Sequence, residues 1–229
     1  MKVTGIKQLD ELLNPLDKHW ITEFYGDFDL VLRVMHYTMV YKSSENTVYV
    51  VFNVEFGGID TLYLVKLCRI FDCKLDNIVI SRAFRLNDAV EILEDLASKN
   101  NSIVLLAFPY NYLPFNPAKY TEATRVTGII AKIAAFNQVI LFNTVSKHGN
   151  HMPEGGSFHH HVVKVIVKLK QSRGVVYAEL LKHPVKQGGR RIFTEKTLDY
   201  PLHSLKRRTI LEWFTSTQYS PGHALMSMR

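Results

Sequence analysis

The sequence predicts an α/β fold built on a mostly parallel central sheet, with helices on both faces and an antiparallel extension at its C-terminal end. Short runs rich in β-branched residues alternate with longer segments of helical period, which is typical of a parallel sheet. Two runs, VYVVFN and SIVLLAF, are apolar almost throughout, as strands buried on both faces must be. The last two runs are joined by the short turn QSRG, which indicates a hairpin and therefore an antiparallel pair.

Seven strands and four helices are expected between residues 20 and 181. The strands are residues 20–25, 47–53, 77–81, 102–108, 138–144, 162–169 and 175–181. The helices separate the first five strands and cover residues 30–41, 59–71, 86–99 and 121–136. In the last helix, apolar residues recur at the spacing of one helical face, so that face should pack on the core while Arg125 and Lys132 point elsewhere.

The chain is expected to form one core domain, residues 1–201, followed by a C-terminal helix and tail, residues 202–229. Residues 202–214, LHSLKRRTILEWF, have the pattern of an amphipathic helix. Residues 145–160 contain three glycines and a proline and show no apolar period. Segments of that length without structure of their own tend to be functional or disordered.

The charge balance suits an anionic partner. The 229 residues include 28 Lys and Arg against 21 Asp and Glu, for a formal net charge of +7. Such an excess favours nucleic acid, although many basic proteins bind none. No apolar run approaches the length of a membrane span, and the N-terminal residues lack a signal-peptide core. A cytoplasmic protein without membrane contact is therefore expected.

The cysteines and the histidine triplet predict no metal site. Cys68 and Cys73 lie five residues apart, which fits neither a C-x-x-C redox motif nor a zinc site. We expect two half-buried thiols in a reducing cytosol. The histidines of residues 159–161 stand where a strand is expected to begin, and adjacent strand residues point to opposite faces, so at most two could reach one ion.

Several segments, in order along the chain, resemble the ATPase core of the RecA family, specifically the archaeal RadA recombinase and its paralogues. Residues 4–13, TGIKQLDELL, are similar to the segment before the first core strand of RadA proteins, and residues 21–26, ITEFYG, resemble that strand. Residues 155–174 resemble the second DNA-binding loop, its following strand and its turn, and residues 181–194 resemble the last core strands. The resemblance implies a RecA-like P-loop NTPase fold and an archaeal protein of homologous recombination.

Two parts of RadA proteins have no counterpart in this resemblance. RadA carries an N-terminal helical DNA-binding domain and a linker whose phenylalanine motif docks on the next protomer. Here the resemblance begins at Thr4 and Gly5, close to the first residue. Filament formation by the usual route is therefore not expected.

The resemblance also implies a nucleotide site that has degenerated in this chain. A working loop, G-x-x-x-x-G-K-[ST], needs glycines to wrap the phosphates, a lysine to neutralise their charge and a hydroxyl for magnesium. Counted from Gly26, the second glycine falls on Val31, the lysine on Leu32 and the hydroxyl on Arg33. Arg33 could still touch a phosphate, but we favour a solvated helix residue.

The acidic residues of the site are changed as well. Ala107 stands at or next to the position of the magnesium-binding aspartate, and Asn53 replaces a second aspartate, while Glu55 keeps the glutamate of the family. Together these losses predict a pseudo-ATPase with no cofactor, in which apolar residues 30–32 fill the former phosphate cradle.

Two loops at the carboxyl ends of central strands remain as a DNA face. The first, about residues 110–121, interleaves aromatic residues with Lys119, as single-strand binding requires, although the rings could instead pack on the domain. The second, near residues 147–152, leads into a strand whose lysines alternate on one face, either as a basic stripe or as the wet face of an edge strand. The DNA-binding candidates are Tyr112, Phe115, Lys119, Arg125, Lys147, His148, His151, Lys164, Lys168, Lys170 and Arg173.

The sequence thus predicts a non-catalytic RadA-like accessory protein of homologous recombination or DNA repair. Its partners would be single-stranded DNA, a catalytically active RadA-type recombinase, or both. Because this family places ATP between protomers, such a subunit could also complete or cap a neighbour's site. The alternatives are a protein-interaction scaffold with the RecA fold and no DNA contact, or a divergent ATP-binding ATPase.

Overall fold

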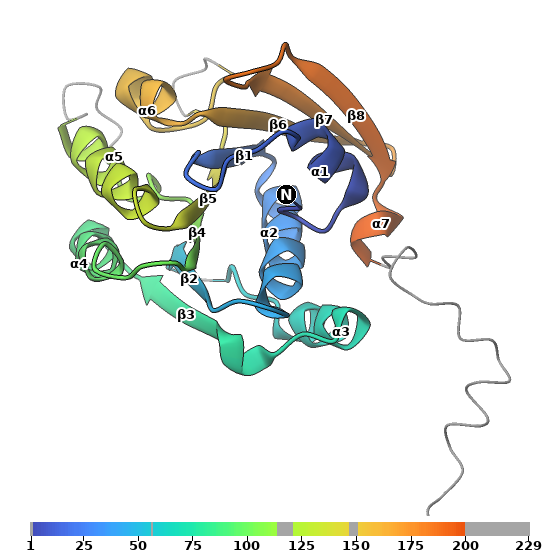
Figure 1. The fold of residues 1–229 in the computed structure, drawn as a ribbon, viewed down its shortest axis with the longest axis horizontal. Coiled ribbons are helices and arrows are strands. Elements are labelled where there is room, and N and C mark those ends of the chain that lie inside the picture. The colour runs from blue at the N-terminus through green and yellow to red at the C-terminus, as the bar shows by residue number, and fades with distance from the viewer. Residues whose placement is uncertain (1, 56, 114–120, 147–150, 200–229) are drawn as a thin grey trace, which may run out of the picture.

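The computed structural model describes residues 2–55, 57–113, 121–146 and 151–199. Its centre is an eight-stranded sheet in the order β3-β2-β4-β5-β1-β6-β7-β8 (Figure 1). The strands are β1 (Thr22–Gly26), β2 (Val48–Asn53), β3 (Ile78–Ala83), β4 (Ile103–Ala107), β5 (Gln138–Thr144), β6 (Val165–Ser172), β7 (Val175–Lys182) and β8 (Gly189–Thr194). The pairs from β3 to β6 are parallel, and β7 and β8 follow as antiparallel strands, so the predicted sheet is confirmed.

The helices lie on both sides of the parallel strands. They are α1 (Lys7–Leu13), α2 (Phe28–Ser43), α3 (Thr61–Phe71), α4 (Leu86–Leu96), α5 (Thr121–Ala134), α6 (Gly156–Val162) and α7 (Lys196–Asp199), and a 3₁₀ turn, η1 (Leu75–Asn77), precedes β3. Figure 1 shows α4, α5 and α6 on one side of the sheet and α1, α2, α3 and α7 on the other. Within the described ranges, no helix is long and apolar enough to cross a membrane.

Two apolar clusters form the core, one on each face of the sheet. Successive side chains of a strand point to opposite faces. On β1, Phe24 therefore joins the cluster beneath α2 and α3, and Tyr25 joins the cluster beneath α4 and α5. Both side chains are fully buried. The central strands are thus apolar on both faces because each face packs against helices.

Within the segment of residues 145–160, the described residues 145–146 and 151–160 are more regular than the sequence indicated. The chain forms an antiparallel bridge between Val145 and Pro153 and then turns into α6. His159, His160 and His161 therefore lie on a helix, and their expected place at a strand start is wrong. Among the described residues, no group of three potential ligands could hold a metal ion. The helix expected at residues 202–214 lies outside the described residues.

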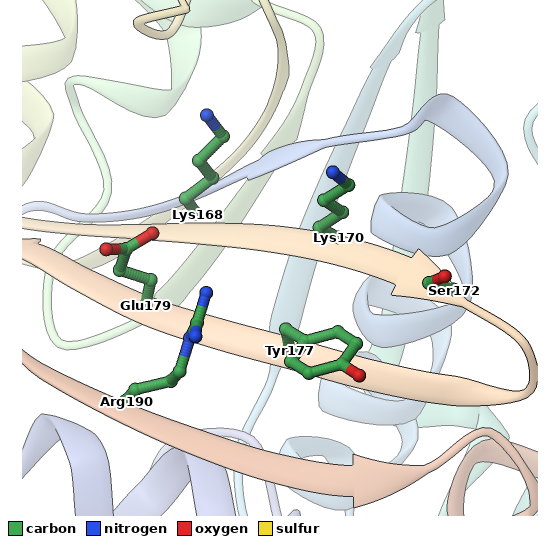
Figure 2. A pocket seen from close by; sticks show the side chains of 6 residues that line it. All are labelled: Lys168, Lys170, Ser172, Tyr177, Glu179 and Arg190. Carbon is green, nitrogen blue, oxygen red and sulfur yellow. The ribbon is translucent and has the colours of Figure 1, made fainter.

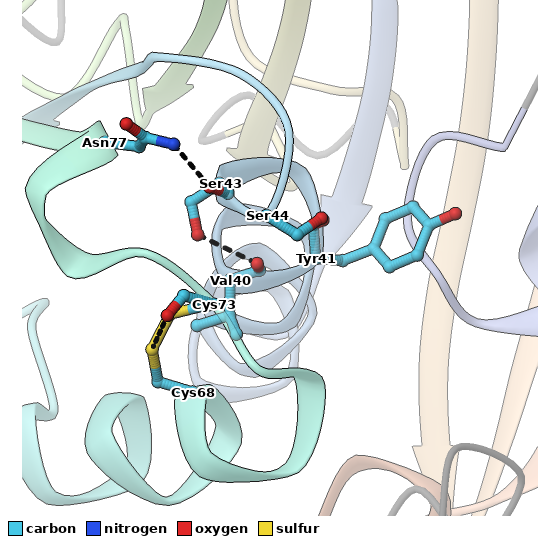
Figure 3. Close-up of a disulfide and its surroundings, with 7 residues drawn as sticks. All are labelled: Val40, Tyr41, Ser43, Ser44, Cys68, Cys73 and Asn77. Atoms are coloured by element: carbon cyan, nitrogen blue, oxygen red, sulfur yellow. Dashed lines mark hydrogen bonds between the residues drawn. A yellow bond between two sulfur atoms is a disulfide. The ribbon is translucent and has the colours of Figure 1, made fainter.

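The two cysteines form a disulfide at the end of α3 (Figure 3), so the expectation of free thiols is wrong. Asp72, directly after the helix, adopts a left-handed φ of 51°. The Cys73 amide then donates a hydrogen bond back to the Cys68 carbonyl, 3.1 Å away. This reversal brings the two Cα atoms to 4.8 Å, within the range that a disulfide spans. Spacing alone did not indicate the reversal.

Candidate functional site

The connection between β1 and α2 is shorter than a phosphate-binding loop. β1 ends at Gly26 and α2 begins at Phe28, so Asp27 alone lies between them. A phosphate loop needs several residues there, so that successive backbone N–H groups can wrap the anion. Gly26 instead meets a neighbouring strand: a Cβ atom on it would lie 2.1 Å from the Leu169 carbonyl oxygen. The close approach of β6 explains this glycine without a nucleotide.

Apolar side chains fill the first turns of α2. Leu30, Val31 and Leu32 are all buried, and they pack in the cluster beneath α2 and α3. Phe28, in the first turn of α2, stacks on Phe108 just after β4, with ring centroids 4.5 Å apart. Phe28 is 41% exposed, so this stack reaches the surface, and the buried residues that follow it face the apolar core, which offers a triphosphate no polar partner.

Arg33 is engaged within the chain, and our interpretation of it as a solvated residue is wrong. Its Nη1 lies 2.6 Å from Glu195 Oε1 and its Nη2 lies 2.6 Å from Asp199 Oδ1. Burial opposes the charge on Arg33, but these carboxylates outweigh it and raise its pKa. The same contact with Arg33 lowers the pKa of Glu195. The guanidinium thus fastens α7 to α2.

The other residues that the sequence resemblance assigns to a nucleotide site lie at or just after the ends of β2 and β4, which are neighbours in the sheet. Asn53 and Ala107 are buried, and Glu55 is exposed. The Asn53 carbonyl accepts a hydrogen bond of 3.0 Å from Asn111 Nδ2. Ala107, at the end of β4, brings no carboxylate to this edge of the sheet.

The described part of the first predicted loop packs on the domain. The half-buried Tyr112 donates a hydrogen bond of 2.7 Å to the carbonyl of Ala83, at the end of β3. Arg125 is exposed on α5 and lies 3.6 Å from Glu94 of α4. Phe115 and Lys119 lie outside the described residues. For Tyr112, this geometry favours the packing alternative over base stacking.

The two ends of the second loop are held together. The Glu154 amide donates to the Thr144 carbonyl at 3.1 Å, and Tyr25 donates its hydroxyl proton to the backbone carbonyl of the exposed His151, 2.8 Å away. Burial, followed by the carboxylates of Glu23 and Glu179, raises the pKa of Tyr25 to about 12, so this donor keeps its proton. Lys147 and His148 lie outside the described residues.

A buried hydrogen-bond chain lies beneath both loops. His159 of α6 contacts Glu23 of β1 through Nε2, at 2.9 Å, and Tyr110 through Nδ1, at 2.8 Å. The Tyr110 hydroxyl also lies 2.8 Å from Thr127 Oγ1 of α5. Asn143 of β5 donates to Glu23 as well, at 2.8 Å. The chain ties the start of the first loop to the helix that follows the second.

The antiparallel strands form a basic groove near the end of the second loop (Figure 2). It has a volume of about 410 Å³. Its lining residues are Lys168, Lys170, Ser172, Tyr177, Glu179 and Arg190. Three cations thus face one carboxylate, which leaves an excess of positive charge along the groove.

Strand register sets the order of these side chains. Lys168, Glu179 and Arg190 form one row across β6, β7 and β8, and Lys170 lies opposite Tyr177 in the next row. The Arg190 guanidinium lies 5.5 Å from the centre of the Tyr177 ring, within cation–π range. The opposite face of these strands is buried in the core, so the alternation predicted for Lys168 and Lys170 is confirmed.

The structure separates the other basic candidates from this groove. Lys164 precedes β6 and lines a different hollow with His19 and His161. Ile166, between Lys164 and Lys168, is buried. The predicted stripe is therefore wrong for Lys164. Arg173 is exposed at the turn between β6 and β7, with a φ of 50°.

Sequence reasoning missed Tyr177 and Arg190. The alternation of β7 places Tyr177 and Glu179 opposite the buried Val176 and Ala178, and this pattern could have put both on the wet face. Their position beside the lysines depends on the pairing of three strands, which no local pattern gives.

The fold defines a class of protein. An α/β sheet in this order, with helices on both faces and an antiparallel end, is the RecA-like fold that the sequence predicted, and a comparison with solved structures confirms it. The chain is similar to the crystal structure of the RadB recombinase, with a TM-score of 0.68 and 18% sequence identity, over 85% of this chain and 96% of that chain. No protein-family model and no curated protein sequence matches the chain.

Proposed function

We propose that this protein is a non-catalytic, RecA-fold accessory factor of recombination or DNA repair that binds single-stranded DNA along its basic groove. The groove is the observation that carries the proposal. It offers Lys168, Lys170 and Arg190 to phosphates and the half-buried Tyr177 as a ring on which a base can stack. Cations beside an aromatic ring are what sequence-independent single-strand binding uses.

The second loop extends this surface. Tyr25 and Lys168 are register partners on β1 and β6, and Tyr25 holds the backbone of His151. The anchored end of the loop therefore lies beside the lysine end of the groove. A DNA strand that runs from the loop across β6 and β7 would therefore pass Lys168 and reach Arg190 on β8.

Binding by this surface needs no nucleotide. The single residue between β1 and α2, the stacked Phe28 and the paired Arg33 leave no phosphate cradle at the family's site. A phosphoryl-transfer site depends on positioned charge, so losing the lysine, the hydroxyl and the metal carboxylate removes catalysis. This supports a pseudo-ATPase over a divergent ATPase.

The first test measures binding of a fluorescein-labelled oligothymidine as a function of salt. For the full chain, the logarithm of the association constant should fall with the logarithm of salt concentration. In the double variant Lys168→Ala/Lys170→Ala, the slope should be shallower by about 0.7 for each phosphate that the protein no longer neutralises. Lys18→Ala removes a lysine at an exposed position before β1 and serves as the matched control. If the double variant shows the same salt dependence and affinity for oligothymidine as this control, DNA does not bind in the groove.

The second candidate function is docking of a RadA-type recombinase or another protein partner without DNA contact. Strand β3 favours it because it lies at the edge of the sheet and carries exposed apolar side chains. Val79 and Ile80 of β3 are 42% and 39% exposed, and Phe84, directly after the strand, is 57% exposed. An open edge with such side chains can accept an extended strand from a partner.

The two functions separate experimentally. Ile80→Lys should abolish capture of a full-length RadA-type recombinase and leave oligothymidine binding unchanged. The double variant Lys168→Ala/Lys170→Ala should weaken oligothymidine binding and leave capture of the recombinase unchanged. If capture persists in Ile80→Lys at unchanged affinity, the β3 edge is not the docking surface.

A further inference from the structure

The buried hydrogen-bond chain beneath the two loops determines where its protons lie. Thr127 Oγ1 is 2.7 Å from the Ala123 carbonyl, which can only accept, so the single hydroxyl proton of Thr127 is used there. Tyr110 must then donate its own proton across the 2.8 Å to Thr127 Oγ1. With that proton used, the Tyr110 oxygen can only accept from His159 Nδ1, 2.8 Å away. Nδ1 of His159 therefore carries a hydrogen.

The other ring nitrogen of His159 faces a carboxylate. Nε2 lies 2.9 Å from Oε1 and 3.0 Å from Oε2 of Glu23. A neutral imidazole with its hydrogen on Nδ1 presents a lone pair at Nε2, which would repel the lone pairs of the carboxylate. One further proton must therefore lie between His159 and Glu23. Reversing every donor would avoid this proton only by leaving the Thr127 and Ala123 oxygens 2.7 Å apart with no hydrogen between them.

This further proton belongs on the imidazole. Imidazole is ordinarily a stronger base than a carboxylate. Glu23 also accepts a hydrogen bond from Asn143 Nδ2, 2.8 Å from its Oε1, and a second donor favours the charged form of a carboxyl group. His159 and Glu23 are both fully buried, so neither charge has water as a partner and each depends on the other.

Other titratable groups around the pair come from β1, from the segment after β4 and from α6 and the residues before it. Among the described residues they are Tyr25, Tyr110, Glu154 and His160. Burial, the largest cause, raises the pKa of both tyrosines, so both keep their protons. His160 contacts the Pro153 carbonyl through Nε2, at 3.0 Å. The neighbours from α5 and β5 are Thr127 and Asn143, which do not titrate.

Close packing also fixes the rings of this hydrogen-bond chain. The rings of Tyr110 and His159 meet edge to face, with centroids 4.9 Å apart. Gly155, directly before α6, has a φ of 130°. A Cβ atom on it would lie 2.7 Å from the Tyr110 ring and 2.8 Å from the His159 ring. A larger residue would push the rings aside, so this glycine permits the hydrogen bonds.

We propose that His159 is a positively charged positioning residue for the two loops. Its imidazolium pairs with Glu23 of β1 and fastens α6, which follows the second loop, to Tyr110 at the start of the first. The contact holds while Nε2 is protonated and is lost as the pH rises far enough to remove that proton, because lone pairs then face each other. The role at the loops rests on the proposed DNA binding, whereas the charge of His159 does not.

The first measurement is the protonation of His159 in the full chain, from ¹H–¹⁵N spectra of its ring nitrogens at about pH 7. Both nitrogens should carry a hydrogen. In Glu23→Gln, the amide oxygen can still accept from Asn143 while the amide nitrogen donates to Nε2, so only Nδ1 should carry one. Glu91→Gln removes an exposed carboxyl group from α4 and, as the matched control, should leave both hydrogens in place. An unmodified protein whose Nε2 carries no hydrogen overturns the proposal, and this result needs no variant to fold.

The second measurement follows the affinity for oligothymidine as the pH is raised. The ring spectra locate the pH at which Nε2 loses its hydrogen, and the affinity of the unmodified protein should fall about 5-fold through that pH, as expected for the loss of one net hydrogen bond. Glu23→Gln needs no extra proton for this contact, so its affinity should show no such step. Melting temperatures establish that the variant is folded.

Two outcomes separate this role from the proposed function. If the unmodified protein binds oligothymidine equally well on both sides of that pH, His159 does not position the loops, although DNA binding stands. If the protein binds no oligothymidine at any pH, the proposed function and the role at the loops fail together, while the ring spectra still decide the charge of His159.

Discussion

At the scale of single residues, Gly26 and Arg33, which the sequence resemblance places in a nucleotide site, have structural contacts of their own in this chain. Arg33, at the hydroxyl position of the resemblance, bonds Glu195 and Asp199. Gly26 is held by contact with β6. The sequence singled out these residues but did not predict what they contact, because both partners of Arg33 lie more than 150 positions away along the chain.

The Arg33 pair predicts a pH-dependent stability. Arg33→Met should lower the free energy of unfolding by about 1 kcal/mol at neutral pH, since it removes two partly exposed ion pairs. Arg33 lowers the pKa of Glu195, so this stabilisation is complete above the usual value of 4.5 and is lost as the pH falls through the lowered one. The free energies of unfolding of the unmodified protein and of Arg33→Met, measured in urea, should therefore differ at neutral pH and become equal in acid. A difference that persists in acid would contradict the ionic account.

The buried chain beneath the loops predicts a second residue effect. Tyr110→Phe removes the hydroxyl between His159 and Thr127 and should destabilise the protein by about 1 to 3 kcal/mol, because buried partners lose their hydrogen bond. Tyr49→Phe, on a half-buried ring outside this chain of hydrogen bonds, is the matched control and should change stability little. Equal melting temperatures for the two variants would show that the hydrogen bonds of Tyr110 contribute nothing to stability.

At the scale of elements, β-branched composition and helical period predicted the seven strands and the four helices that link the first five strands. The short helices were not predicted. α6 has seven residues and lies in a glycine-rich segment, where its histidines form no apolar period. Local patterns therefore identified long elements with a large buried face, and missed those whose formation depends on contacts such as His159 with Glu23.

The junction of β1 and α2 predicts a large effect from a small change. Gly26→Ala should destabilise the protein by about 3 kcal/mol, because the new methyl group would overlap the Leu169 carbonyl and force β1 and β6 apart. Gly128→Ala makes the same change on the exposed face of α5, where nothing lies within 4 Å, and should stabilise by up to about 1 kcal/mol. Thermal unfolding of the pair measures both. If Gly26→Ala lowers the melting temperature only slightly, contact with the Leu169 carbonyl does not explain why a glycine stands at this position.

At the scale of the whole molecule, the candidate surfaces lie at different parts of one sheet. The groove crosses β6, β7 and β8, and the exposed apolar edge is β3 at the other end of the strand order. The fold class and two of the groove's lysines could be predicted from the sequence, because they follow from alternation along single strands. The sequence could not predict that Tyr177 and Arg190 line the groove, because their positions depend on strand pairing. It could not predict that Lys164 lies apart from the groove, because this depends on the burial of Ile166.

We propose that a RecA-like fold binds single-stranded DNA here without a nucleotide. The most direct measurement is the affinity for labelled oligothymidine with and without saturating magnesium ATP. We predict the same dissociation constant in both conditions, and no rise in melting temperature on adding magnesium ATP, since a ligand that binds only the folded state must stabilise it. Tighter DNA binding with ATP, together with a higher melting temperature, would contradict the claim and establish a working nucleotide site.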